Sequence, residues 1–75
     1  MSVRGAIFDF LRSDLYEPHT LDAEHEYAEW RSPLGWVVRV SGPRDRPIVE
    51  ILDPAGRVYL RPSPMTAEAL DYVLP

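Results

Sequence analysis

The sequence contains no cysteine, and its positively charged residues include no lysine. Without cysteine the chain can form neither a disulfide framework nor a thiolate metal site, which favours a reducing, cytoplasmic compartment. Asparagine and glutamine are absent as well, and all eight basic residues are arginine. This bias is typical of a GC-rich bacterial or phage genome, so we attach no functional meaning to the missing lysines.

Long apolar runs are also absent. The longest stretch without a charged residue covers seven positions, 32 to 38, whereas a membrane-spanning helix needs about 20 apolar residues. The N-terminal segment carries Arg4 and Asp9 where a signal peptide has an unbroken apolar region. The net charge of −4 disfavours general binding to nucleic acids or acidic membranes. We therefore expect a small acidic protein of the cytoplasm with no membrane association.

Apolar residues extend along the whole chain and make up 45% of it, which predicts one folded domain over residues 1–75. At the start, Val3, Ile7 and Leu11 recur at helical spacing after Ser2, a residue type that caps helices. Pro18 must end this helix. The polar and acidic segment 17–26 that follows is expected to be a connector.

Helical spacing returns near the C-terminus. Ser63 is the expected N-cap, with Pro64 at the first helical position. Apolar residues at positions 67, 70, 73 and 74 form one stripe of this helix. The sequence therefore predicts a helix at each end of the chain.

The segment between the helices contains the same turn pattern twice, Ser-Pro-Leu-Gly at 32–35 and Asp-Pro-Ala-Gly at 53–56. Proline presets the backbone at the second turn position, and glycine supplies a positive φ. Each turn should close a hairpin, with Trp30 opposite Val38 in the first and Leu52 opposite Val58 in the second. We predict an α+β fold in which a four-stranded antiparallel sheet of two hairpins is flanked by the two helices. A small SH3-like barrel is the alternative.

The alternation of apolar and polar residues assigns the faces of this sheet. In the first hairpin the even-numbered residues are apolar, so we expect both Trp30 and Trp36 in the core. For residues 48–61 either face could be buried, and we favour the even residues, with Ile51 then exposed opposite Tyr59. Glu50 favours burial of the odd residues instead, because its side chain would then point to water.

With the even residues buried, the odd residues form an exposed face of tyrosine, aliphatic and arginine side chains. Tyrosine and arginine are enriched at interface hot spots. We expect a bacterial or phage accessory or regulatory protein that binds a protein partner, or a second copy as a homodimer, through Tyr27, Val37, Arg39, Ile51, Arg57 and Tyr59. The alternatives are a single-stranded nucleic-acid binder that stacks bases on its tyrosines and a small acidic inhibitor protein.

The sequence does not predict catalysis. Each serine is explained by a helix cap or a turn, and the glycines form no phosphate-binding loop. We therefore expect no enzyme activity and no catalytic, cofactor-binding or metal-binding residue. One alternative stays open: His19, Asp22 and His25 follow one another at spacings of three, with Glu26 and Glu29 nearby, and could hold a metal ion if the segment were helical. A solvated acidic loop is the simpler interpretation.

Overall fold

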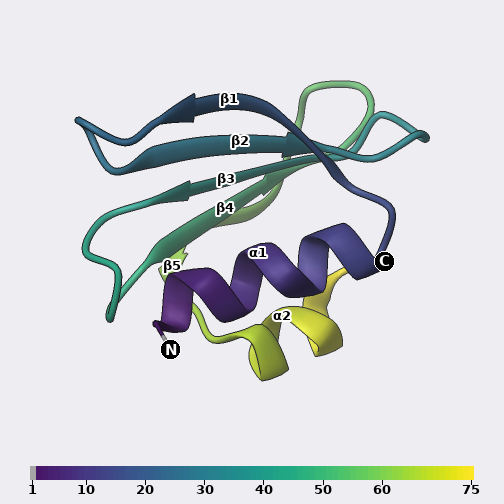
Figure 1. Cartoon of the computed structure of the whole chain (residues 1–75). Helices are drawn as coiled ribbons and strands as arrows, with labels where there is room; N and C mark the ends of the chain where they lie inside the picture. Colours follow the sequence, from purple (N-terminus) through teal and green to yellow (C-terminus); the bar gives the residue numbers. More distant parts are fainter. Residues whose placement is uncertain (1) are drawn as a thin grey trace.

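The computed structural model describes residues 2 to 75 and consists of an antiparallel sheet with two helices on one of its faces (Figure 1). The helices are α1 (Val3–Ser13) and α2 (Ala67–Val73). The strands are β1 (Glu17–Asp22), β2 (Tyr27–Arg31), β3 (Val37–Ser41), β4 (Ile48–Leu52) and β5 (Val58–Pro64). They lie in the sheet in chain order. The α+β prediction is confirmed, but the sheet has five strands rather than four, and it is open rather than closed into a barrel.

The additional strand is β1, which occupies most of the segment that we expected to be a connector. It pairs with β2, for example through Leu21 opposite Ala28, and the register shifts by one residue at His19, between Pro18 and Thr20. Five of its six residues are exposed. Backbone pairing with β2, rather than burial of one face, therefore makes this polar segment a strand.

Helix α1 begins as predicted and ends in a Schellman motif. The Ser2 hydroxyl accepts a hydrogen bond from the Gly5 N–H group at 2.9 Å, so Ser2 is the N-cap. At the other end, the N–H groups of Tyr16 and Leu15 donate to the carbonyl oxygens of Leu11 and Arg12 at 2.8 and 3.2 Å. Leu15 has a left-handed φ of 67° in this motif.

Helix α2 begins later than predicted. Its N-cap is Thr66, whose hydroxyl accepts a hydrogen bond from the Ala69 N–H group at 3.2 Å. Ser63 and Pro64, expected to start the helix, instead end strand β5, where Pro64 lies opposite Ile48. Neither α1 nor α2, the helices of the described chain, is long and apolar enough to cross a membrane.

The core lies between the helices and one face of the sheet. Ala28, Trp30, Val38 and Val40 of the first hairpin are buried as predicted, and Trp30 lies opposite Val38. The Trp30 ring packs near Phe8, with ring centroids 5.2 Å apart, and under the guanidinium of Arg12. The fully or almost fully buried residues are Ile7, Leu11, Tyr16, Ala28, Trp30, Val38, Val40, Val49, Ile51 and Leu70.

Our assignment of the buried face in the second hairpin is wrong for β4. Val38 of β3 pairs with Ile51, and directly paired residues share a face, so the odd residues Val49 and Ile51 are fully buried. Glu50 lies on the exposed face beside Arg39, as the alternative required.

Strand β5 then departs from strict alternation. Leu52 pairs with Val58 as predicted, but Ile51 pairs with Leu60 instead of Tyr59, because a β-bulge inserts one residue between these pairs. Leu60 packs against the core. Tyr59 contacts Trp36, with ring centroids 5.1 Å apart in an edge-to-face arrangement. Trp36 is thus half-buried at the border of the core rather than fully inside it.

Candidate protein-interaction surface

The centre of the exposed sheet face is an ion-pair network around Glu29. Its carboxylate lies 3.1 Å from Arg31 Nη2 and 3.4 Å from Arg39 Nε, and it accepts a hydrogen bond of 3.1 Å from the Tyr27 hydroxyl. Arg39 also donates to Glu50 at 3.2 Å. We call these five residues the Glu29 network. The charged groups at the centre of this face therefore pair with one another.

The pKa of Glu29 reflects this environment. Only 13% of its side chain is exposed, and this burial by itself would raise the pKa of the carboxyl group. Hydrogen bonds from Arg31 and Tyr27, and the charges of Arg31 and Arg39, outweigh the burial, so the pKa of Glu29 lies below its usual value of 4.5. Burial and then the hydrogen bond to Glu29 raise the pKa of Tyr27.

The six residues predicted to bind a partner do not share one surface. Tyr27, Val37 and Arg39 lie half-buried on the exposed face of the sheet. Ile51 was placed on this face wrongly, because it is fully buried in the core. Arg57 lies just before β5 and is exposed, and Tyr59 lies at the bulge beside Trp36.

A second surface lies at the end of the sheet where both Pro-x-Gly turns meet, close to the connection between α1 and β1 (right-hand side of Figure 1). The turns are neighbours, since a Cβ atom on Gly35 would lie 3.4 Å from the Cβ atom of Pro54. The large apolar side chains exposed here include Leu15 by 71%, Leu34 by 80% and Tyr59 by 50%. Together with Trp36 we call these three residues the turn-end patch.

The turn-end patch is contiguous. A groove of about 440 Å³ is lined by Leu15, Leu34 and Trp36, together with Asp14, Tyr16, Ser32, Pro33 and Pro75. Tyr59 extends the patch beyond the groove through its contact with Trp36. Two of the four side chains are aromatic and two are aliphatic, so this end of the molecule presents apolar surface to solvent.

Leu15 has an unusual position within the patch. It holds a left-handed φ of 67° at the point of the Schellman motif where glycine is favoured, and a Cβ atom there costs roughly 1 kcal/mol. Its side chain is mostly exposed, so burial does not offset this cost. Folding alone gives no reason for a leucine at position 15.

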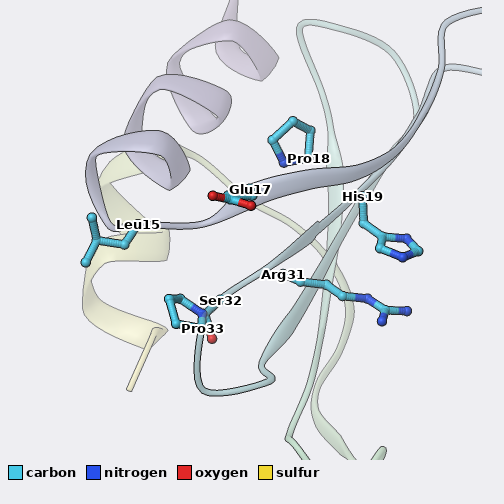
Figure 2. A pocket seen from close by; sticks show the side chains of 7 residues that line it. All are labelled: Leu15, Glu17, Pro18, His19, Arg31, Ser32 and Pro33. Carbon is cyan, nitrogen blue, oxygen red and sulfur yellow. The ribbon is translucent and has the colours of Figure 1, made fainter.

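A second groove, of about 350 Å³, lies at the start of β1 (Figure 2). Leu15 lies on one side of it, whereas His19 and Arg31 point away to the other side. Arg31 is paired with Glu29. The Ser32 hydroxyl accepts a hydrogen bond from the Trp36 N–H group at 3.1 Å. The polar groups of this groove thus serve the sheet and the turn, and they do not form a nucleophile with its base.

The candidate metal ligands between residues 19 and 29 are dispersed. His25 Nδ1 lies 2.7 Å from Asp22 Oδ2 at the β1–β2 turn, whereas His19 Nδ1 lies 3.7 Å from Glu29 on the exposed face of the sheet. Among residues 2 to 75, no three histidine, aspartate or glutamate side chains gather as a metal ion requires.

Sequence reasoning missed Leu15 and Leu34. Leu34 occupies a turn position where polar residues are common, and Leu15 lies just beyond the end of α1, where glycine is favoured. The signal that could have found them is an apolar residue at a position that a turn or a helix end exposes. Comparisons of the chain with protein-family models, with curated proteins and with solved structures found no match.

Proposed function

We propose that the protein is a non-catalytic interaction module of the cytoplasm that binds a protein partner through the turn-end patch. The observation that carries the proposal is the exposure of Leu15, Leu34 and Tyr59 around Trp36 on one end of the molecule. Contiguous exposed apolar patches mark interaction sites, and aromatic residues are enriched in the buried centres of interfaces.

The backbone of Leu15 supports this proposal independently. Strained conformations that the packing does not explain are concentrated at functional sites. A glycine at position 15 would relieve the strain, whereas the exposed leucine supplies an apolar side chain next to the groove. A partner that buries this side chain would offset the cost of holding it there.

A nucleic-acid partner has less support. Tyr27 lies at the β1–β2 turn and Tyr59 at the opposite end of the sheet, so the two rings do not form one stacking platform. Arg31 and Arg39 are paired with carboxylates of the Glu29 network rather than open to phosphates. The apolar chemistry of the turn-end patch is suited to a protein surface.

Site-specific photocrosslinking tests the proposal. A photoreactive leucine analogue is placed at position 34, in the patch, or at position 24, which is exposed in the β1–β2 turn at the other end of the sheet. Each protein is irradiated alone and in extracts of the producing cell. We expect discrete protein adducts from position 34 and few from position 24. Equal labelling from the two positions, or no adduct of any protein from position 34, would contradict the proposal.

The same probe at position 34 is then combined with Leu15→Gly. Because glycine suits the left-handed backbone, we expect the variant to be as stable as the parent or more stable by up to about 1 kcal/mol. The yield of adducts should nevertheless fall about fivefold, because a side chain at the edge of the interface is lost. Urea unfolding and adduct yield measure the two effects separately, so a loss of binding is not confused with a loss of folding.

A further inference from the structure

Three segments lie in a row along the end of the sheet that carries the turn-end patch. In strand order they are the α1–β1 connection, the β2–β3 turn and the β4–β5 turn (Figure 1). Leu15 belongs to the first, Leu34 and Trp36 to the second, and Tyr59 follows the third. An apolar row of this kind can pack against the same row of a second copy. A twofold axis through the middle of the row then places each end against the opposite end of the other copy.

The two ends of this row differ in charge. At the Leu15 end, Asp14 and Glu17 are both exposed. At the Tyr59 end, Arg57 has 83% of its side chain exposed. The nearest carboxylate to Arg57 is that of Asp53, at 4.0 Å. This contact is to Oδ2 and is too long for a hydrogen bond, while the other oxygen, Oδ1, accepts hydrogen bonds from the backbone N–H groups of Ala55 and Arg57. The guanidinium therefore remains available to a partner.

We infer that the partner of the turn-end patch is a second copy of this chain, bound about a twofold axis with Asp14 of each copy facing Arg57 of the other. The inference rests on the proposed function and names its partner. It follows from the charge complementarity of the two ends, because the same pairing forms twice in a symmetric dimer. The apolar side chains of Leu34 and Trp36 lie near the axis and lose contact with water.

Two other routes to a dimer are disfavoured by the chain itself. Pairing of sheet edges is hindered on both sides, since β1 contains Pro18 and β5 contains Pro62 and Pro64, and proline has no N–H group to offer an incoming strand. Pairing through the exposed sheet face would desolvate the Glu29 network, whose charges are already satisfied within one chain.

Charge reversal tests both the partner and its orientation. In a homodimer of the Asp14→Arg variant, two positive charges meet at each contact. In a homodimer of the Arg57→Asp variant, two negative charges meet at each contact. Each variant alone should dimerise about tenfold more weakly than the parent, or worse. An equimolar mixture should restore the affinity, because each contact of the heterodimer again joins opposite charges. Sedimentation equilibrium from micromolar to millimolar concentration measures the affinities, and native mass spectrometry identifies the heterodimer.

Matched controls carry the same charge changes away from the patch. Asp45→Arg and Arg44→Asp lie in the exposed β3–β4 loop, and both should dimerise like the parent. A parent that stays monomeric at every concentration overturns the inference, and adducts of a different protein from position 34 would then leave the proposed function intact. A mixture of the two reversed variants that stays monomeric, although circular dichroism shows both folded, also overturns it.

Discussion

Glu29 shows how a single carboxylate can join the strands of an exposed sheet face. It contacts His19 of β1 at 3.7 Å, Arg31 of its own strand at 3.1 Å and Arg39 of β3 at 3.4 Å. Arg39 continues the chain of contacts to Glu50 of β4. Because most of Glu29 is withdrawn from water, its ion pairs are less screened than those of a fully exposed pair. We therefore expect this residue to contribute to stability in a way that depends on pH.

Glu29→Gln tests this contribution. At neutral pH the substitution should lower the free energy of unfolding by about 1 to 2 kcal/mol, because the arginines lose their charged acceptor. The folded-state pKa of Glu29 is lowered from 4.5, so its contribution is present above that value and is lost as the pH falls through the folded-state pKa. The difference in the free energy of unfolding between parent and variant should accordingly become smaller at acidic pH.

Urea unfolding at neutral pH and over a series of acidic pH values measures this difference. Glu24→Gln is the matched control, because Glu24 is exposed in the β1–β2 turn, and it should change stability by less than about 0.5 kcal/mol. A parent-to-variant difference that stays constant from neutral to acid pH would show that the charge of Glu29 is not what stabilises the sheet.

At the scale of elements, the two hairpins could be predicted because their turns are encoded locally. Pro33 with Gly35, and Pro54 with Gly56, specify where each hairpin closes, and the expected pairs of Trp30 with Val38 and of Leu52 with Val58 are present. The N-cap of α1 is local in the same sense, since one serine hydroxyl and one N–H group define it. Such features need no knowledge of the rest of the fold.

The remaining elements depend on contacts between distant parts of the chain. Strand β1 buries almost nothing of its own, so only its pairing with β2 reveals it. The bulges of β5 have no sequence signature here, yet they separate Ile51 from the expected partner Tyr59 and so change which side chains share a face. The bulge thus removed Tyr59 from the expected face, whereas Ile51 was misplaced because the pairing of β4 with β3, which buries it opposite Val38, was not predicted.

The turn glycines provide a prediction at this scale. Gly56 has a φ of 85° and open space where a Cβ atom would stand, whereas Gly35 has a φ of 95° and a Pro54 side chain at 3.4 Å from that point. Gly56→Ala should therefore cost about 1 kcal/mol through the backbone alone, and Gly35→Ala at least as much.

Gly56→Asn should recover part of the cost of Gly56→Ala, because asparagine tolerates positive φ better than alanine does. Urea unfolding of the three variants ranks them. If Gly56→Ala were as stable as the parent, or Gly56→Asn less stable than Gly56→Ala, the second turn would not require its positive φ, and the close match between the two Pro-x-Gly turns would have another origin.

The parts of the sheet differ in what they offer a partner: one face is covered by the helices, the other carries paired charges, the two edges carry proline, and one end carries the turn-end patch. Both edges carry proline, Pro18 on β1 and Pro62 with Pro64 on β5, which is a common device against uncontrolled strand pairing. A partner is thereby directed to side-chain surfaces, of which the turn-end patch is the one that we propose. Under the proposed function, the prolines of the edges limit association and the turn-end patch binds the partner.

Replacing Pro62 and Pro64 together with threonine should open the β5 edge, because each threonine returns an N–H group and favours an extended backbone. We expect the double variant to fold with a loss of about 1 to 2 kcal/mol, since proline restricts the unfolded chain at these positions. On prolonged incubation at high concentration it should form large aggregates that light scattering detects, while the parent stays at the size of a small, defined oligomer.

Pro43→Thr, in the exposed β3–β4 loop, has no edge to open and serves as the control. Aggregation of this control to the same extent, or none in the double variant, would mean that the prolines of β5 do not protect the sheet.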